Sequence, residues 1–466
     1  MNVKRLFVAL FMIALFTIAV RETLDPDMWW HLRTGEYILQ AGIPRHDVFS
    51  FTVPDHEWLT HEWLSQVFMW SVYRVGGLPG LTVMFALLTA VSFFLVYRVS
   101  AGRPYLAVFV VLLGAFASAI VWGVRPQIFN TLFTAVFIYI VERYRNGETG
   151  QRTLWWLPVV TIIWANFHSG YLLGVVYLAV FTLGEALEIV LQPRAPLETP
   201  PMTWSQVRGL AGITAVSFLA AAINPNGPEM WIYPFLTLGS SAMQTYIVEW
   251  NSPDFHQRIF WPFLALGGLG VVGWAFGSRR PRLSDLLLFG GTAFAGFVSA
   301  RNIPLFAIIA PPIVCRALVG WLAVNPRLAA FLQEPTAPPR PTARQTALHA
   351  AVLVLALVAA LIWTLDIIAG NETAVAENFP VTAVAYLQES GLAEKRGYNS
   401  YNWGGYLIWE GIPVFIDGRA DVYGDQFMLF YLQAYKAKET WQEPLAEYDV
   451  DYVLMEKGQP LNSLLA

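Results

Sequence analysis

The stretch DPDMWWHLRTGEYI (residues 25–38) follows directly after the first apolar run of the chain. It places two carboxylates, two tryptophans, a histidine and an arginine where a helix would leave a membrane. Pro26 near its start and Gly42 beyond its end are typical of helix boundaries, so we expect a helix over this segment. A simple anchor needs none of these polar groups, and we therefore expect the segment to carry part of a functional site.

The composition is that of a polytopic membrane protein. Of the 466 residues, 56% are hydrophobic and 13% are charged, whereas soluble proteins contain about 25% charged residues. Several windows of about 17 to 22 residues carry almost no charge, which is enough to cross a hydrocarbon layer of about 30 Å. The net charge of −4 gives no reason to expect a nucleic-acid partner. The single cysteine, Cys315, lies in an apolar run and cannot form an intramolecular disulfide.

Apolar runs along the chain predict about eleven membrane-spanning helices. The first run begins with basic residues, but it lacks a small-x-small cleavage site, so we expect an uncleaved helix rather than a signal peptide. The predicted spans lie near residues 5–20, 78–97, 104–122, 127–142, 154–166, 169–190, 208–223, 259–276, 283–299, 303–323 and 346–368.

The positions of Lys and Arg predict which side of the membrane each connection faces. If the N-terminus is cytoplasmic, every cytoplasmic connection contains arginine, including YRVSAGR (97–103) and ERYRNGETGQR (142–152). Because cytoplasmic loops are enriched in Lys and Arg, we expect the N-terminus inside and the C-terminus outside. The last cytoplasmic connection contains EPTAPPRPTAR (334–344), whose prolines indicate a disordered linker.

In this orientation the outer side receives the polar side chains that could carry chemistry. The first outer segment, residues 21–77, contains two predicted amphipathic helices, which are expected to lie in the headgroup layer. A second amphipathic piece covers residues 224–255. The polar residues on this side are Asp25, Asp27, His31, Glu57, His61, Glu62, Arg125, His168, Asn224, Glu249, Asp254, Arg301, Asp417, Arg419 and Asp421.

The composition divides the chain into a transmembrane domain, residues 1–370, and a small extracytoplasmic α/β domain, residues 371–466. In the second domain, YLIWEG (406–411), IPVFIDG (412–418) and DYVLMEK (451–457) are predicted strands. PVTAVAYLQESG (380–391) and GDQFMLFYLQAYKA (424–437) are predicted helices.

Asp25 and Asp27 are expected to play different roles. An Asp directly before a proline is a favoured N-cap, which explains Asp25 without further function. Asp27 shares a helical face with His31 one turn later. This acid–imidazole pair could accept a proton, bind a metal or simply be solvated.

Glu57, His61 and Glu62 lie at or just before the start of the second amphipathic helix. Their spacing allows a metal site, but Thr60 in the same stretch is also a candidate helix cap.

Arg125 and Arg301 each stand at the outer end of a predicted span. They could reach to the membrane interface or bind phosphate oxygens through two parallel hydrogen bonds. An arginine between long apolar runs carries a large free-energy cost in the membrane unless an acidic group or a backbone carbonyl pairs with it. His168 lies between two predicted spans. It could contribute to the same phosphate site, or its ring could simply form hydrogen bonds with nearby backbone groups.

In the tail, YNWGGYLIWEGIPVFIDGRADVYGD (401–425) is the most polar and aromatic motif. Gly404 and Gly405 allow a close backbone approach or a tight turn, and Asp417 with Gly418 is a natural turn pair. The alternative to a structural turn is contact with an acceptor or with the membrane domain. The chain shows no phosphate loop, Rossmann fingerprint, zinc ligand set or Gly-x-Ser-x-Gly elbow, which disfavours soluble nucleotide-dependent chemistry.

The topology and the first outer loop resemble the GT-C fold of membrane glycosyltransferases that use polyprenyl-phosphate-linked sugars. Catalytic subunits of oligosaccharyltransferases begin this loop with D-x-W-[FW]-x-x-R-x-x-E-Y-[LI]. The resemblance implies that Asp27 is the functional acid. The matching residues here are Asp27, Trp29, Trp30, Arg33, Glu36, Tyr37 and Ile38.

Two departures from the family limit what the resemblance implies. The next outer loop, SAIVWGVRPQ (118–127), has Arg125 where the family carries an acidic motif that helps bind a divalent metal. We therefore predict no cofactor, and the missing acidic motif disfavours a divalent metal. The tail offers YNWGGY without the Asp of the Trp-Trp-Asp-Tyr-Gly acceptor motif, so peptide N-glycosylation is not expected. The chain is more similar to bacterial members that modify lipids, glycans or surface polymers, which predicts a bacterial inner membrane.

The predicted function is transfer of a sugar from a polyprenyl-phosphate donor, with inversion at the anomeric carbon. Asp27, with Asp25 and His31, is the predicted catalytic group. Arg125 and Arg301, with His168, are predicted to bind the donor phosphate. The alternatives are a non-enzymatic lipid or solute transporter and a non-catalytic scaffold of the same fold. Acceptor-side candidates are Glu57, His61, Glu62, Glu249, Tyr401, Trp403, Asp417 and Arg419.

Overall fold

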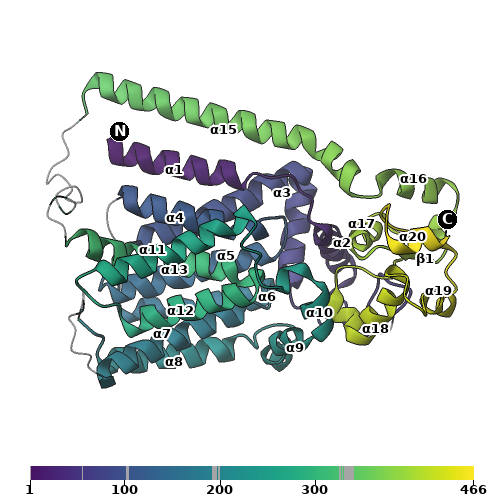
Figure 1. Cartoon of the computed structure of the whole chain (residues 1–466), viewed down its shortest axis with the longest axis horizontal. Helices are drawn as coiled ribbons and strands as arrows, with labels where there is room; N and C mark the ends of the chain where they lie inside the picture. Colours follow the sequence, from purple (N-terminus) through teal and green to yellow (C-terminus); the bar gives the residue numbers. More distant parts are fainter. Residues whose placement is uncertain are drawn as a thin grey trace.

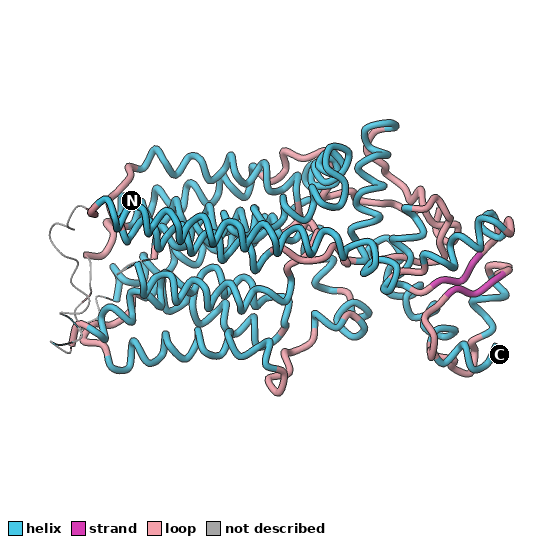
Figure 2. The backbone as a smooth tube through the Cα atoms, turned by 90° about the horizontal axis from the view of Figure 1, so that it is seen from above, coloured by secondary structure: helices cyan, strands magenta, loops and turns pink. Residues whose placement is uncertain are grey.

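The structure, a computed structural model of the chain, describes residues 2–465 except 55, 101–103, 192–196, 198–199, 325–326, 328 and 330–340. Long helices lie side by side in a bundle, and the C-terminal part lies beyond one end of it (Figure 1). The view turned by 90° shows the same division (Figure 2). Most of the predicted linker 334–344 lies outside the described residues.

Each predicted apolar run contains a helix of the bundle. Among the described residues, six helical stretches are long and apolar enough to cross a membrane, and α12 is apolar but shorter. The mainly helical fold class is confirmed, while the number of spans and their direction remain predictions. The helices are α1 (Val3–Ala19), α3 (Trp63–Val99), α4 (Pro104–Ser118), α5 (Gln127–Arg145), α6 (Trp156–Phe167), α7 (Tyr171–Leu191), α8 (Trp204–Ala220), α11 (Trp261–Phe276), α12 (Leu283–Val298), α13 (Ile303–Leu322) and α15 (Ala343–Asn378).

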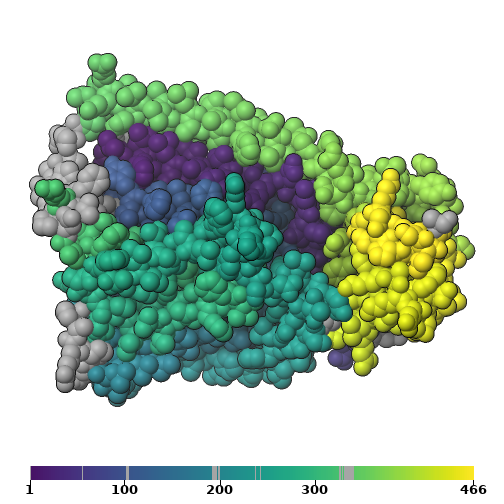
Figure 3. Space-filling view, in the orientation of Figure 1, coloured from purple at the N-terminus to yellow at the C-terminus, as the bar shows by residue number. Residues whose placement is uncertain are grey.

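Helix α13 lies at the centre of the bundle and α15 lies at its edge. In the most apolar stretch of α13, 78% of the residues are buried, against 11% in α15. Gly114 lets α4 approach α13 closely, because a Cβ there would stand 2.6 Å from the carbonyl oxygen of Ala307. α15 runs along α1 (Figure 3). Many of the apolar side chains of α15 are exposed. We therefore expect its outer face to contact lipid.

Helix α2 (Pro26–Ala41) has the boundaries that the sequence predicts. Asp25 is its N-cap, accepting a hydrogen bond from the backbone N–H of Asp27, and Pro26 is its first residue. Gly42 follows the helix with a φ of 90°, a conformation that favours glycine. α2 packs on α3 so tightly that a Cβ at Gly35 would overlap the carbonyl group of Gln66.

Helix α3 joins the second predicted amphipathic helix to the second predicted span. Gly77 has a φ of 60° inside it and Pro79 follows, so the helix bends at this point. The predicted cap at Thr60 is wrong. Glu62 is the N-cap residue of α3, and the Thr60 hydroxyl donates to the carbonyl oxygen of Pro44 at 2.9 Å.

Two short helices, α9 (Tyr233–Gly239) and α10 (Ser241–Tyr246), cover part of the second amphipathic piece. The Tyr233 hydroxyl donates to Asp421, and the backbone N–H of Ser241 donates to Asp425, each at 2.9 Å. These bonds tie the segment to the C-terminal part. Short 3-10 helices are η1 (Ala119–Val121), η2 (Gln151–Trp155), η3 (Gly227–Trp231), η4 (Val248–Trp250), η5 (Arg258–Phe260), η6 (Ala300–Asn302), η7 (Leu392–Glu394) and η8 (Tyr401–Trp403).

The C-terminal part contains a two-stranded parallel sheet surrounded by helices. Gly397 pairs with Tyr452 in the register of the two strands. α15 continues through the predicted boundary at residue 370, and hydrogen bonds of 2.7 Å join Asn371 to Thr23. The elements are α16 (Val381–Glu389), β1 (Gly397–Asn399), α17 (Gly404–Trp409), α18 (Ala420–Tyr435), α19 (Gln442–Glu447), β2 (Tyr452–Leu454) and α20 (Pro460–Leu465).

Two of the predicted strands are wrong. YLIWEG (406–411) is mostly helix α17, and IPVFIDG (412–418) forms a single bridge between Val414 and Ser50. A short buried apolar run does not distinguish a strand from a helix. Here Gly405 packs on the backbone of Pro26, so the contact with α2 determines that this run is helical. The strand predicted in DYVLMEK (451–457) and both predicted helices of the tail are confirmed.

A buried ionic cluster joins the first loop to the C-terminal part. The guanidinium of Arg419 donates to Asp47 and to Asp417, each at 2.6 Å, and all three side chains are fully buried. The rings of Phe49 and Trp58 lie against the same guanidinium, with centroids 5.0 and 4.6 Å from it. One arginine therefore holds together two segments that are far apart in the sequence.

Replacing Arg419 by Met should lower the free energy of unfolding strongly, because it leaves two carboxylates buried without their cation. Breaking a buried pair in this way costs about 3–5 kcal/mol. The measurement is denaturant or thermal unfolding of the purified protein. Arg396→Met is the control, because Arg396 pairs with the exposed Asp449 and exposed pairs contribute about 0–1 kcal/mol. Similar losses in the two variants would contradict the prediction.

Candidate functional site

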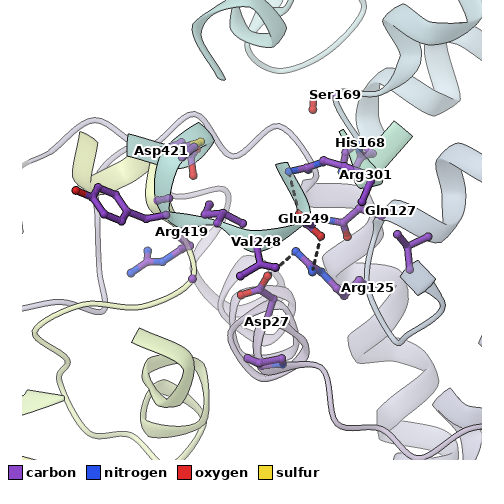
Figure 4. Close-up of a pocket in the computed structure, with 18 of the residues that line it drawn as sticks. Asp27, Arg125, Gln127, His168, Ser169, Val248, Glu249, Arg301, Arg419 and Asp421 are labelled. Atoms are coloured by element: carbon purple, nitrogen blue, oxygen red, sulfur yellow. Dashed lines mark ion pairs between the residues drawn. The ribbon is translucent and has the colours of Figure 1, made fainter. Parts of the chain in front are cut away.

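A cavity of about 700 Å³ lies where the helical bundle meets the C-terminal part. Its wall includes Asp27 and His31 from α2, Arg125 from the loop before α5, and Arg301 from η6. Tyr401 and Arg419 come from the C-terminal part. Figure 4 shows that these elements surround a shared space. Residues from distant parts of the chain are thus brought together at the end of the bundle.

Asp27 and Arg125 form a close ion pair in the cavity wall. Oδ2 of Asp27 lies 2.7 Å from a terminal nitrogen of Arg125, and Oδ2 of Asp25 lies 3.4 Å from its Nε. The indole N–H of Trp30 donates to Oδ1 of Asp27 at 3.1 Å. The predicted catalytic acid is therefore held by one cation and one neutral donor.

The ion pairs continue from Arg125 to a second arginine. Glu249 in η4 lies 3.9 Å from Arg125 and 3.1 Å from Arg301 (Figure 4). The guanidinium of Arg301 also lies 5.0 Å from the ring centroid of Trp250. One carboxylate thus reaches both arginines, so a single anion of similar size can contact both.

Burial changes the proton affinities of these groups. It raises the pKa of Asp25 to about 7 and also raises the pKa of Asp27, while the positive charge of Arg125 opposes both effects. Burial alone would lower the pKa of Arg125, but the two carboxylates raise it above its usual value. A carboxylate with a raised pKa is a stronger base near neutral pH.

Glu62 is surrounded by three histidines on another side of the same cavity. Its carboxylate oxygens lie 3.7 Å from His31, 3.7 Å from His61 and 3.8 Å from His168. Burial raises the pKa of Glu62 to about 8, and it lowers the pKa of each histidine. At neutral pH the carboxyl therefore holds its proton and the three imidazoles are neutral.

Gly418 is a site residue that the sequence analysis treated only as part of a turn. A Cβ at this position would overlap the carboxylate of Asp27, so the backbone of the tail rests directly on the predicted acid. The hydroxyl of Tyr401 donates to the carbonyl oxygen of Gly418 at 3.1 Å. Trp30 was named only as part of the family motif and not as a site residue, although its position three residues after Asp27 places it on the same helical face.

Several predicted acceptor-side residues lie outside the cavity wall. Glu57 is exposed and lines a separate cavity of about 610 Å³. Trp403 donates its indole N–H to the carbonyl oxygen of Asn378, and Asp417 belongs to the buried cluster around Arg419. Glu249 does line the cavity, but it lies between the two arginines predicted to bind phosphate.

The residues beside Asp27 do not fit the divalent metal that the resemblance to oligosaccharyltransferases implies. The guanidinium of Arg125 occupies the position next to Asp25 and Asp27 where a cation would be held. Across the described residues, no group of three or more His, Cys, Asp or Glu side chains is arranged to hold a metal ion. The positive charge beside Asp27 is supplied by an arginine.

Replacing Glu62 by Gln should change how stability depends on pH. The folded protein favours the protonated carboxyl, so the contribution of Glu62 to stability should fall as pH rises from about 4.5, the ordinary value, to about 8, the value in the fold. Gln cannot ionise, so the variant should lose part of this fall. The measurement is the unfolding midpoint of the protein in lipid nanodiscs between pH 4.5 and 9. Glu57→Gln is the control, and identical curves for all three proteins would contradict the prediction.

Comparison with known proteins shows a likeness in fold. No protein-family model and no curated protein sequence matches the chain. The apo oligosaccharyltransferase of Archaeoglobus fulgidus matches it with a TM-score of 0.58 at 11% identity, over 97% of this chain and 69% of that chain. The same enzyme, AglB, in complex with an inhibitory peptide and a dolichol-phosphate gives a TM-score of 0.57, with the same identity and coverage.

A weaker likeness is to ArnT from Cupriavidus metallidurans bound to undecaprenyl phosphate. Its TM-score is 0.47 at 12% identity, over 92% of this chain and 87% of that chain. The fold comparison therefore rests on the archaeal enzyme. The chain has the GT-C fold that the first loop predicts.

Proposed function

We propose that the protein is a membrane glycosyltransferase that takes its sugar from a polyprenyl-phosphate-linked donor. The acceptor is a lipid, glycan or surface polymer at the extracytoplasmic face of a bacterial inner membrane. The observation that carries the proposal is the chain of ion pairs from Asp27 through Arg125 and Glu249 to Arg301 in one cavity wall. The fold shared with AglB, which has been solved with a dolichol-phosphate, supports it.

The two arginines provide a place for the donor phosphate. Glu249 bridges Arg125 and Arg301 with a single carboxylate, as a phosphate group would. A phosphate offers more acceptor oxygens than a carboxylate, and arginine binds phosphate through two parallel hydrogen bonds. The donor phosphate therefore displaces Glu249 when it binds, and the arginines then stabilise the charge that develops as it leaves.

Asp27 is the general base for the acceptor. It takes the proton of an acceptor hydroxyl as that oxygen attacks the anomeric carbon of the sugar. The bond from this carbon to the phosphate oxygen breaks on the opposite side, which inverts the configuration. Trp30 and Arg125 hold the carboxylate of Asp27 in place during this step.

Asp27→Asn should reduce transfer by about 100-fold or more, because a general base contributes about 10²- to 10⁴-fold. Donor binding should remain, since Asn can still accept the hydrogen bond from Trp30. The measurement is release of free polyprenyl phosphate in nanodiscs supplied with a panel of polyprenyl-phosphate sugars.

Asp449→Asn is the control, because Asp449 is exposed and is not part of the cavity wall. Full transfer by Asp27→Asn would remove Asp27 from the mechanism. Donor binding without release by the wild type would instead favour the transporter or the scaffold.

Arg301 and Glu249 should affect phosphate binding in opposite directions. Arg301→Gln should weaken binding of polyprenyl phosphate by about tenfold or more, because it removes a charge-assisted hydrogen bond. Glu249→Gln should strengthen binding, because it removes a competing anion from the same two arginines. Titration of polyprenyl phosphate into each purified variant measures both effects.

Arg152→Gln serves as the control, because Arg152 is exposed and belongs to η2, away from the cavity wall. Weaker binding by Glu249→Gln would show that Glu249 supports the phosphate site instead of competing for it.

A further inference from the structure

Two glutamines in the wall of the cavity carry amide oxygens without a hydrogen-bond partner. Oε1 of Gln66 in α3 and Oε1 of Gln127 in α5 are both buried, and no residue that the structure describes donates a hydrogen bond to either. Gln66 as a whole is 1% exposed. A buried acceptor without a donor destabilises the fold, so a wall with two such acceptors suits a ligand that supplies the donors.

The position of Gln66 is set by two contacts with α2. Its Nε2 lies 3.4 Å from Nδ1 of His31, and its backbone carbonyl lies where a Cβ at Gly35 would overlap it. An amide nitrogen only donates, so Nδ1 of His31 accepts in this contact and the amide oxygen of Gln66 is the group left for a ligand. Two packed helices thus hold this oxygen in place, which is the support that a selective site needs.

Gln127 lies on the phosphate side of the cavity. It is the first residue of α5, and Arg125 precedes it by two residues. Figure 4 shows its side chain in the same part of the cavity wall as Arg125 and Glu249. Since Arg125 lies 2.7 Å from Asp27, Gln127 is near both the proposed base and the proposed phosphate site.

The chemistry of the two amide oxygens excludes the phosphate as their partner. An ionised phosphate diester offers only acceptor oxygens, and two acceptors form no hydrogen bond. The polyprenyl chain has no polar hydrogen. In a polyprenyl-phosphate sugar the hydrogen-bond donors are therefore on the sugar. Because the anomeric carbon lies between Asp27 and the phosphate during transfer, the sugar attached to it occupies the cavity that both glutamines line.

We propose that Gln66 and Gln127 select the donor sugar by accepting hydrogen bonds from its hydroxyl groups. The proposal rests on the proposed glycosyltransferase function and narrows its substrate class to a sugar with free hydroxyl groups where it faces the two amides, in preference to a deoxy or O-acylated sugar. Arg125 and Arg301 bind the phosphate, which every donor shares, whereas the glutamines distinguish one sugar from another. They determine specificity and take no part in the proton transfer to Asp27.

The first test uses the wild type and a panel of polyprenyl-phosphate hexoses, each with its monodeoxy forms. The measurement is kcat/KM for release of polyprenyl phosphate in nanodiscs. Removing a hydroxyl that faces a glutamine should lower kcat/KM about tenfold, because the buried amide then stays without its donor. Removing a hydroxyl elsewhere on the sugar should have little effect.

The second test removes one acceptor at a time. Gln66→Met and Gln127→Met keep about the same side-chain length without an amide. Each should lose about tenfold in kcat/KM with the preferred hexose and should no longer distinguish it from one of its monodeoxy forms, a different form for each variant. Binding of free polyprenyl phosphate, which has no sugar, should stay within about threefold of the wild type.

Gln388→Met is the matched control, because Gln388 is exposed in α16 and is not part of the cavity wall. It should keep the wild-type preference among the sugars.

Donor binding without any acceptor separates the sugar from the acceptor substrate. Titration of the preferred polyprenyl-phosphate hexose should show about tenfold weaker binding by Gln66→Met and by Gln127→Met. The same titration of the wild type with the monodeoxy forms tests the proposal if a variant does not fold.

An equal loss with every sugar would show that the glutamines only support the cavity. Unchanged donor binding with poorer use of the acceptor would assign them to the acceptor, and equal use of hexose and monodeoxy forms by the wild type would leave them no role in selection. Each of these results would overturn the proposal and leave the glycosyltransferase in place. A wild type that releases no polyprenyl phosphate from any donor would overturn both.

Discussion

The buried guanidinium of Arg419 is the constraint on which the site depends. It lies between Asp47 of the first loop and Asp417 of the tail, and neither carboxylate could stay buried as an ion without it. Gly418 lies between Asp417 and Arg419 in the chain, and its backbone is therefore pressed against Asp27. The position of the proposed base is thus set by the ion pairs of Arg419, which join the first loop to the C-terminal tail.

The cavity separates two kinds of electrostatic environment within a short distance. Along one side, Asp27, Arg125, Glu249 and Arg301 form a row of charges with alternating sign. Along the other side, Glu62 and the histidines around it are neutral at neutral pH. Fixed charges suit the binding of a phosphate, whereas neutral polar groups suit the binding of sugar hydroxyls. This division explains why so many polar residues are needed in one cavity.

Local sequence signals predicted the helices well. Asp25, Pro26 and Gly42 define α2 because capping and the conformation of glycine depend on neighbouring residues. The apolar runs of the bundle were found for a similar reason, since each must satisfy its own backbone in the membrane. The family motif that singled out Asp27 also lies within one helix, and the GT-C fold it implied is confirmed.

The errors concern residues whose positions depend on distant contacts. YLIWEG (406–411) became helix α17 because Gly405 packs on α2 more than three hundred residues earlier. Glu249 stays a predicted acceptor-side residue, but its ion pairs with Arg125 and Arg301 were not predicted, because no local pattern connects it to them. The histidine cluster was likewise not predicted as a unit, because His31, Glu62 and His168 come from three separate segments.

If residues 78–99 of α3 span the bilayer, the bend at Gly77 sets the height of the cavity above the membrane. Residues 78–99 of α3 form about 33 Å of helix at a rise of about 1.5 Å per residue, close to the hydrocarbon thickness of about 30 Å. If this part of α3 spans the bilayer, Gly77 lies near the level of the lipid phosphates, and α2 rests on the part of α3 just beyond it. A lipid-linked donor then brings its phosphate to the cavity simply by staying in the membrane. An acceptor must extend its hydroxyl to the same level, so the distance of that hydroxyl from the membrane becomes a criterion of selection in addition to its chemistry.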